Sequence, residues 1–223
     1  MGAVIAERLA DVRRRMAAAA ERVDRDPADV ELVAVSKRQP PEHLHAAYAA
    51  GHRVFGENRA QELVAHAELL PDDVAWHMIG HLQRNKAGAV AAVAAALDSL
   101  DSERLAVAWA RTGSNVPVHV QVNLAEEPQK GGVAPDALDD LLAVCADLAI
   151  PAVGLMVLPP FDPDPEAARP WFRRLRALRD TISERHPTVR GLSMGMSGDF
   201  EVAIEEGSTS IRVGTTIFGP RLG

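Results

Sequence analysis

Lys37 is the residue whose type and position most clearly suggest covalent chemistry. It follows the run LVAVS, in which four apolar residues precede a serine. A lysine at the end of a strand can simply be a solvated terminus. A lysine removed from water, however, has a lowered pKa, and its larger fraction of neutral amine can attack a carbonyl carbon to form a Schiff base.

A second group of residues has the composition of a phosphate site. The segments LSMGMSGD and GSTSIRVGTTIFG supply Gly195, Ser197, Gly198, Gly214 and Thr215. Small side chains, hydroxyls and exposed backbone amides close to a helix start bind anions, phosphate in particular. The alternative is that the glycines only form turns and that Ser197 caps the helix that follows.

Three other groups predict less chemistry. His77 and His81 are four residues apart in WHMIGH, but the glutamate of the HExxH zinc motif is missing, so we expect no metal site. Cys145 lies at helical spacing from leucines in DDLLAVCADLAI and is expected to pack as a small core residue rather than to act as a nucleophile. The arginines of RPWFRRLRALRD are expected on a solvated helix face.

The elements that must position these residues alternate along the chain. Eight apolar runs are separated by helix-like stretches, and an amphipathic helix over about residues 3–24 precedes them. The runs are VELVAVSK, HRVFGEN, AWHMIGH, AALDSL, VPVHVQVNL, IPAVGLMVL, VRGLSMGM and TSIRVGTTIFG. This alternation predicts an α/β fold, a single TIM-type (β/α)8 barrel with an extra N-terminal helix, as one domain over residues 1–223. A doubly wound open sheet is the alternative.

Active sites of such barrels form at the C-terminal ends of the strands. Lys37 ends the first run, Asn58 ends the second, and Ser197 and Gly214 lie at the seventh and eighth. Closure of the barrel would bring the first strand beside the eighth. The lysine and the phosphate-type residues would then be neighbours, which indicates a phosphorylated aldehyde as ligand.

Composition excludes several classes of function. The 223 residues are 47% hydrophobic and 25% charged, which is ordinary for a globular protein. A net charge of -7 argues against non-specific nucleic-acid binding. One cysteine permits no intrachain disulfide, and the N-terminal MGAVIAERLADVRRRM resembles neither a signal peptide nor a membrane span. We therefore expect a soluble cytoplasmic protein with no membrane or nucleic-acid partner.

Several long motifs resemble those of the pyridoxal phosphate homeostasis protein family, which is related to the barrel domain of alanine racemase. The resemblance extends from about Val30 to Gly219 and is weaker over residues 125–129, so no role is carried over to Lys130 or Gly131. The motifs are AVSK, FGENRAQE, WHMIGHLQRNK, GLMVLPP, LSMGMSGDFEVAIEEGST and IRVGTTIFG.

The resemblance implies a cofactor and a set of cofactor-binding residues. Lys37 is expected to form a Schiff base with pyridoxal 5'-phosphate (PLP). Asn58 is expected to approach the cofactor, and Arg212 to face its pyridine nitrogen. The residues expected to bind the phosphate are Ser197, Gly214 and Thr215.

The same residues favour a carrier over an enzyme. An arginine beside the pyridine nitrogen disfavours its protonation, which makes the ring a weaker electron sink. Racemases of the related family use a tyrosine on a second domain as another base. Here the single tyrosine, Tyr48, lies in a predicted helix, and we expect no second domain after Gly223.

We therefore expect a monomeric PLP-binding homeostasis protein without catalytic residues or robust turnover. Apo forms of PLP-dependent enzymes are its expected recipients. A weak PLP-dependent amino-acid racemase is one alternative. The other is an aldolase-type lyase, in which Lys37 binds a sugar phosphate directly.

Overall fold

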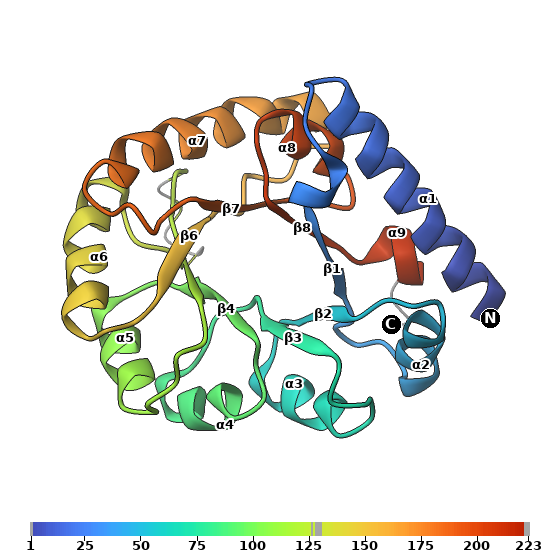
Figure 1. Ribbon diagram of the computed structural model, residues 1–223, viewed down its shortest axis with the longest axis horizontal. Helices are drawn as coiled ribbons and strands as arrows, with labels where there is room; N and C mark the ends of the chain where they lie inside the picture. Colours follow the sequence, from blue (N-terminus) through green and yellow to red (C-terminus); the bar gives the residue numbers. More distant parts are fainter. Residues whose placement is uncertain (1, 126, 128–130, 221–223) are drawn as a thin grey trace.

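Eight parallel strands, found within the residues that the structure describes, form a closed barrel (Figure 1). The structure is a computed structural model and describes residues 2–125, 127 and 131–220. The strands are β1 (Glu31–Val35), β2 (Val54–Glu57), β3 (Ala75–Met78), β4 (Ala96–Leu100), β5 (Val118–Gln121), β6 (Ala152–Met156), β7 (Gly191–Met196) and β8 (Ser210–Val213). Pairing of β8 with β1 closes the barrel and aligns Leu32 with Ile211 and Ala34 with Val213. The predicted barrel is confirmed, because an open sheet has no such pair.

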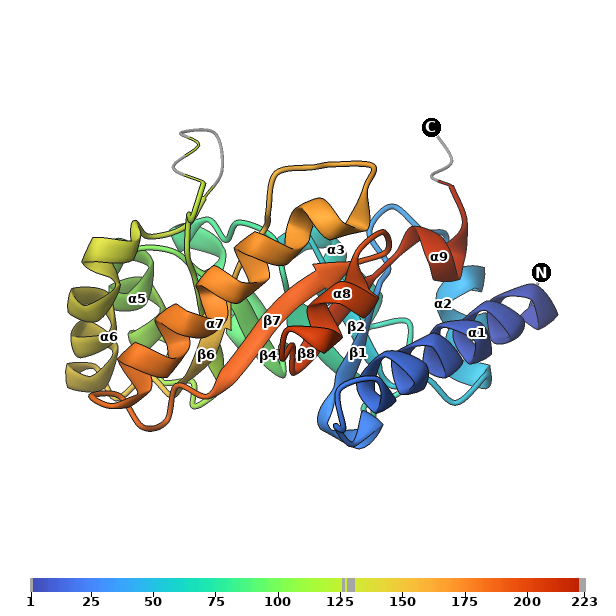
Figure 2. The same ribbon diagram turned by 90° about the horizontal axis from the view of Figure 1, so that it is seen from above.

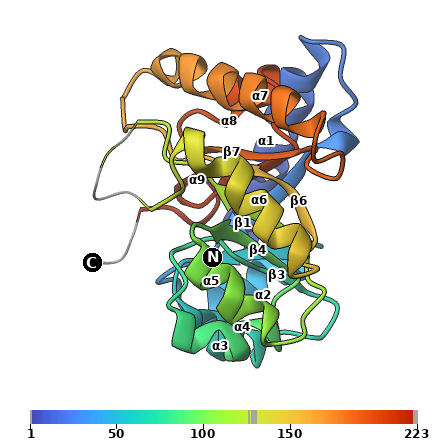
Figure 3. The same ribbon diagram turned by 90° about the vertical axis from the view of Figure 1, so that its left-hand side faces the viewer.

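Helices surround the strands as an outer layer (Figures 1 and 2). The α-helices are α1 (Gly2–Glu21), α2 (Pro41–Ala49), α3 (Ala60–Ala67), α4 (Ala87–Ala91), α5 (Glu103–Ala110), α6 (Leu138–Asp147), α7 (Arg169–Ser183), α8 (Phe200–Glu205) and α9 (Thr215–Phe218). Short 3₁₀ helices are η1 (Pro27–Asp29), η2 (Arg84–Lys86), η3 (Pro135–Ala137) and η4 (Pro165–Ala168). The longest helix after α1 is α7, which runs along the outside of β6 and β7 (Figure 3).

The predicted N-terminal helix is present as α1. Its buried face includes Ile5, Leu9, Val12 and Met16, the residues that the apolar periodicity selects. Through this face α1 packs against α2, α8 and α9 outside the barrel (Figure 1). None of the helices in the described parts of the chain is long and apolar enough to cross a membrane.

The eighth apolar run is shorter as a strand than its composition predicts. Strand β8 ends at Val213, and the continuation TTIF forms α9. Gly214 lies between them with φ -116° and ψ -74°, so the chain leaves the extended conformation there. The helix after β7, α8, begins at Phe200, with Asp199 at its N-cap position.

The two faces of the strands differ in polarity. Outward residues such as Leu97, Val118 and Ile211 belong to the apolar core that packs under the helices. Since successive side chains on a strand point to opposite faces, their neighbours Asp98, His119 and Arg212 point into the barrel. The barrel interior, called the lumen below, therefore holds buried charged and polar side chains.

Candidate functional site

Lys37 lies in a tight turn directly after β1 and is half-buried. The Ser36 amide donates to the Gly56 carbonyl oxygen over 3.0 Å, and the Gln39 amide donates to the Ser36 carbonyl oxygen over 3.0 Å. Arg38 adopts φ +57°, a left-handed conformation that completes the turn. Backbone hydrogen bonds on both sides thus fix the position of the lysine at the C-terminal end of its strand.

A buried carboxylate anchors this turn to the neighbouring helix. Glu57 Oε1 accepts from Ser36 Oγ over 2.6 Å and from His66 Nδ1 over 2.8 Å. A carboxylate only accepts, so His66 carries its proton on Nδ1. Glu57 ends the run HRVFGEN with Gly56 and Asn58, but no role was predicted for it from the sequence. Its role is to tie the ends of β1 and β2 to α3.

Asn58 follows Glu57 at the end of β2 and presents an unsatisfied acceptor. Its Oδ1 is buried and has no hydrogen-bond partner in the part of the chain that the structure describes. The backbone of Asn58 also approaches Gly80 so closely that any Cβ at position 80 would clash with it. A buried oxygen of this kind is explained by a ligand or solvent donor that completes its bonding.

The ends of β7 and β8 are joined by the hydroxyl predicted to bind phosphate. Ser197 Oγ accepts from the Gly214 amide over 3.1 Å, and Thr216 Oγ1 donates to the Ser197 carbonyl oxygen over 3.4 Å. Ser197 therefore bridges two strand ends and does not cap α8. Thr215 is exposed and begins α9, whose first backbone N–H groups lack acceptors within the helix.

Barrel closure brings these groups together. Val213 pairs with Ala34, and a Cβ at Gly214 would lie 3.3 Å from the Val35 carbonyl oxygen. Lys37 follows two residues after Val35, so the lysine and the Ser197–Gly214 bridge lie on adjacent strand ends. Gly195, two residues before Ser197, adopts φ +96°, and a Cβ there would lie 2.5 Å from the Ala203 Cβ. The backbone next to the bridge therefore requires a glycine.

Arg212 lies inside the lumen and is almost completely buried, with 3% of its surface exposed. Its Nη1 donates to Ser193 Oγ over 2.6 Å and its Nη2 donates to the Val157 carbonyl oxygen over 3.0 Å. Burial lowers the pKa of the guanidinium, and the negative charges of Asp98 and Asp199 oppose this effect. The arginine is thus held by β7 and by the residue after β6.

Asp98 forms the centre of a second polar group in the lumen. It is fully buried, and its two oxygens accept from His77 Nδ1 over 3.2 Å and from His119 Nδ1 over 2.7 Å. Burial disfavours its charge, but the charge of His119 and the hydrogen bonds from both histidines outweigh this and hold its pKa well below the usual range. The sequence reasoning did not identify this carboxylate.

The histidines considered as a metal pair lie in different surroundings. His77 is buried with Asp98, while His81 is exposed and bonded through Nδ1 to Asp101 Oδ2 over 2.8 Å. No cluster of three or more metal-ligating side chains occurs among the described residues. Cys145 is buried in α6, and burial raises the pKa of its thiol to about 11, as befits an inert core residue.

Tyr48 lies away from the C-terminal ends of the strands. It belongs to α2, its hydroxyl donates to Asp73 Oδ1 over 3.0 Å, and the guanidinium of Arg53 stacks on its ring. The segment after β5 contributes Gly131, whose carbonyl oxygen accepts from Gln121 Nε2 over 2.7 Å. Lys130 lies outside the described residues.

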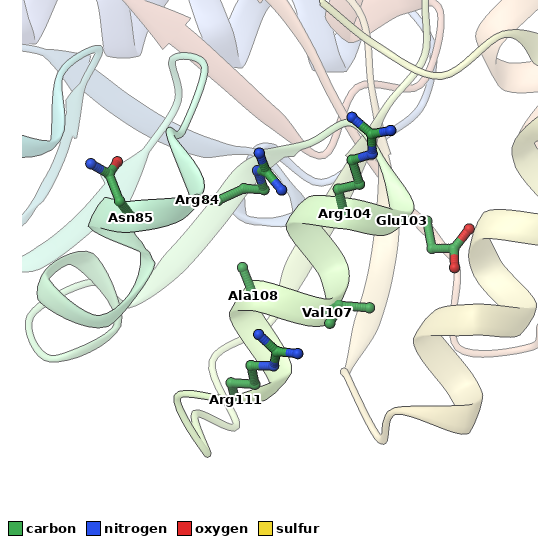
Figure 4. Close-up of a pocket in the computed structure, with 7 residues that line it drawn as sticks. All are labelled: Arg84, Asn85, Glu103, Arg104, Val107, Ala108 and Arg111. Carbon is green, nitrogen blue, oxygen red and sulfur yellow. The ribbon is translucent and has the colours of Figure 1, made fainter.

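A separate groove occurs on the outer surface between η2 and α5 (Figure 4). It has a volume of about 510 Å³ and is open to solvent. Its lining consists of Arg84, Asn85, Glu103, Arg104, Val107, Ala108 and Arg111. None of the strand-end residues described above contributes to it, so the groove and the candidate site are distinct.

Comparison with known proteins gives consistent matches over the whole barrel. Residues 8–221 match the family described as alanine racemase, N-terminal domain. The pyridoxal phosphate homeostasis protein of Aquifex aeolicus is 42% identical, with 96% of this chain and 97% of that protein covered. The protein of the same name from Escherichia coli is 38% identical, with 97% of each covered. The structure of PipY from Synechococcus elongatus with PLP bound has a TM-score of 0.81 and 38% identity, covering 96% of this chain and all of that one (100%).

Proposed function

Because the chain belongs to the pyridoxal phosphate homeostasis protein family, with a barrel of the alanine racemase N-terminal type, we propose that it binds PLP and serves intracellular PLP homeostasis. In this proposal Lys37 holds the cofactor as a Schiff base. The bound cofactor would supply a reactive aldehyde carbon and an aromatic ring that withdraws electrons. The protein would store and deliver PLP without robust turnover.

The observation that carries the proposal is the meeting of three complementary features at neighbouring strand ends. Lys37 supplies an amine in a fixed turn, and Asn58 supplies a buried oxygen without a partner. The Ser197–Gly214 bridge and the start of α9 supply the hydroxyl and backbone amides that suit a phosphate. PLP fits this arrangement, because the C-terminal mouth of the barrel would offer it an amine, an acceptor that faces its ring and a site for its phosphate.

The remaining residues have supporting roles in this proposal. Arg212 would face the pyridine nitrogen and keep it unprotonated, because two positive charges at short range repel. Thr215 would add its exposed hydroxyl to the phosphate site. Glu57, through Ser36, would keep the lysine turn in place.

Two features support a carrier rather than an efficient enzyme. Arg212 would weaken the ring as an electron sink. The hydroxyl of Tyr48 is engaged with Asp73, which lies just before the start of β3, so the chain's one tyrosine is not placed to move a proton at the C-terminal strand ends. Recipients would be apo forms of PLP-dependent enzymes. We expect the carrier to act as a monomer, which light scattering of the PLP-loaded protein would test.

Absorption spectroscopy tests the proposal directly. The protein saturated with PLP should show the visible band of a Schiff base, and Lys37→Ala should abolish it. Lys86→Ala, a lysine change in η2 away from the strand ends, should leave the band unchanged. Borohydride reduction followed by mass spectrometry should locate PLP on the peptide that contains Lys37. The proposal fails if the wild-type protein shows no band at saturating PLP.

Weak amino-acid racemase activity is the second candidate, and the match to the alanine racemase N-terminal domain favours it. Exchange of the α-hydrogen of an added amino acid with solvent deuterium would reveal it. We expect exchange in the PLP-loaded protein to be no faster than with free PLP. Faster exchange that Lys37→Ala removes would favour the racemase.

A further inference from the structure

The guanidinium of Arg212 is a buried positive charge without a directly bonded carboxylate among the described residues. Both of its recorded acceptors, Ser193 Oγ and the Val157 carbonyl oxygen, are uncharged. Hydrogen bonds to neutral oxygens satisfy its N–H groups but leave its charge unbalanced. A buried charge of this kind is costly unless an opposite charge lies within the same low-dielectric region.

Asp98 is suited to supply that opposite charge. It extends into the lumen from β4, between outward residues of the apolar core, and it is fully buried. The negative charges of Asp98 and Asp199 both raise the pKa of Arg212, and of the two carboxylates Asp98 is the one that is completely buried. Asp199 is also less suited because its burial is partial and raises its pKa, and because it is bonded to the Met196 amide.

We infer that Asp98, held in place by His77 and His119, is the counter-charge that keeps Arg212 charged and in position inside the lumen. Asp98 is thus a positioning residue for the arginine that would face the pyridine ring. This inference rests on the proposed function only for its consequence for PLP. The charge pairing itself is a property of the protein without cofactor.

The histidines explain how the carboxylate stays ionised. Each directs Nδ1 at a different oxygen of Asp98, so both oxygens are occupied by donors. Burial disfavours protonation of His77, but the hydrogen bond that it donates to Asp98 and the charges of Asp98 and Glu31 raise its pKa. The cluster therefore keeps a negative charge at its centre over the ordinary pH range.

Few other ionisable groups face this cluster. Glu31 at the start of β1 is partly exposed, with its Oε2 3.7 Å from His77 Nε2. Lys37 and Asp199 lie at the C-terminal strand ends. Inward residues of β2, β6 and β7 include Gly56, Gly154, Met156 and Ser193, none of which is ionisable. The acid of β2, Glu57, points outward to His66.

A double-mutant cycle on the full chain stripped of PLP tests the charge pairing. Asp98→Asn leaves Arg212 without its counter-charge, and Arg212→Met leaves Asp98 without the arginine. Thermal unfolding should show that the double variant is more stable than Asp98→Asn alone, because the second change removes the unbalanced charge. If Asp98→Asn does not fold, recovery of folding in the double variant supports the charge pairing in the same way.

A matched surface pair provides the control cycle. Asp139 is likewise bonded to a histidine, the half-buried His186, and lies 3.1 Å from Arg185 Nε, but the side chains of Asp139 and Arg185 are 44% and 59% exposed. Asp139→Asn and Arg185→Met should have additive effects on the unfolding temperature. A double Asp98/Arg212 variant that is no more stable than Asp98→Asn alone would overturn the inference.

A spectroscopic titration tests the consequence for bound PLP. In this inference Asp98 balances the arginine that would face the ring, so loss of its negative charge disfavours the protonated, more positive form of the Schiff base. Its absorbance midpoint should therefore move to lower pH in Asp98→Asn, by roughly half to one pH unit, and stay unchanged in Asp139→Asn. An unchanged midpoint in Asp98→Asn also contradicts the inference. Absence of any band in the wild type would instead contradict the proposed function and leave the unfolding cycle to decide the pairing.

Discussion

At the scale of single residues, the unsatisfied oxygen of Asn58 separates a binding role from a structural one. The side chain contributes no hydrogen bond through Oδ1 to the described fold, so its removal breaks none. A residue that only stabilised the barrel would instead have its polar atoms bonded within the protein, and its removal would break those bonds. Asn58 therefore offers a test in which affinity and stability respond differently.

We predict that Asn58→Ala weakens PLP binding by about tenfold, the loss expected for one hydrogen bond to a ligand. The unfolding temperature of the PLP-free protein should stay within about 2 °C of the wild-type value, because no internal hydrogen bond is lost. Absorbance titration and thermal unfolding measure the two quantities. Asn85→Ala, on the exposed helix η2, is the matched control and should change neither. Equal affinity of Asn58→Ala and wild type would contradict a contact with the cofactor.

The polar residues at the strand ends were predictable from the sequence, whereas the face of the strand that each side chain takes within a run was not. Lys37, Asn58 and Ser197 follow apolar runs, and that position alone places them at the mouth of a barrel. Glu57 and Asp98 lie within runs, where the sequence does not say which face a side chain takes. Only the strand register directs Glu57 outward to His66 and Asp98 inward to two other histidines.

At the scale of elements, the junction between α2 and β2 contains a neutral buried histidine. His52 Nε2 donates to the Val54 carbonyl oxygen over 2.7 Å, while its Nδ1 lies 3.4 Å from Arg13 Nη2 on α1. Burial lowers the pKa of His52 to about 4, and the positive charges of Arg13 and Arg53 act in the same direction. The neutral ring thus links the N-terminal helix to the start of β2.

This geometry predicts a loss of stability in mild acid. Unfolded His52 takes up a proton near pH 6.5, whereas folded His52 does so only near pH 4. Between these values the unfolded state binds more protons, so the stabilisation is complete above pH 6.5 and is lost as the pH falls. Urea unfolding should show a loss of about 2 kcal/mol from this residue between pH 7 and pH 5.

The variant His52→Gln should remove this pH dependence, because the glutamine amide can still donate to Val54 and does not titrate. His45→Gln changes an exposed histidine of α2 and should leave the wild-type pH dependence intact. Identical losses in His52→Gln and wild type would show that another group titrates instead.

Eight of the nine α-helices in the described residues were predictable in approximate position, and α9 was not. The amphipathic helix predicted over about residues 3–24 is present as α1, Gly2–Glu21. The segment TTIF has the composition of a strand, yet it forms α9 because Gly214 turns the chain away from the sheet. Tertiary context at the mouth, including the bond from Gly214 to Ser197, decides this local conformation.

At the scale of the whole molecule, the first and last strands meet at a single closing seam. Helices α1, α8 and α9 cover this region from outside (Figure 1). Ion pairs also cross the same part of the surface, with Arg22 bonded to Glu205 over 2.7 Å and Arg169 bonded to Glu205 and Glu206 over 2.7 Å each. The chain ends are therefore held together both in the sheet and among the helices.

The proposed cofactor would bridge this seam, since Lys37 follows β1 while Ser197 and Gly214 follow β7 and β8. A ligand that binds only the folded protein stabilises it by RT ln(1 + [L]/Kd), about 2.7 kcal/mol at a hundredfold excess over Kd. We predict that PLP at this concentration raises the unfolding temperature by roughly 5 to 10 °C. Pyridoxine 5'-phosphate keeps the phosphate but lacks the aldehyde, so at equal concentration it should give a smaller increase. Lys37→Ala should make the two ligands equivalent, because only phosphate and ring contacts then remain. If both ligands raised the unfolding temperature of the wild-type protein equally, the bond between Lys37 and PLP would contribute nothing to stability.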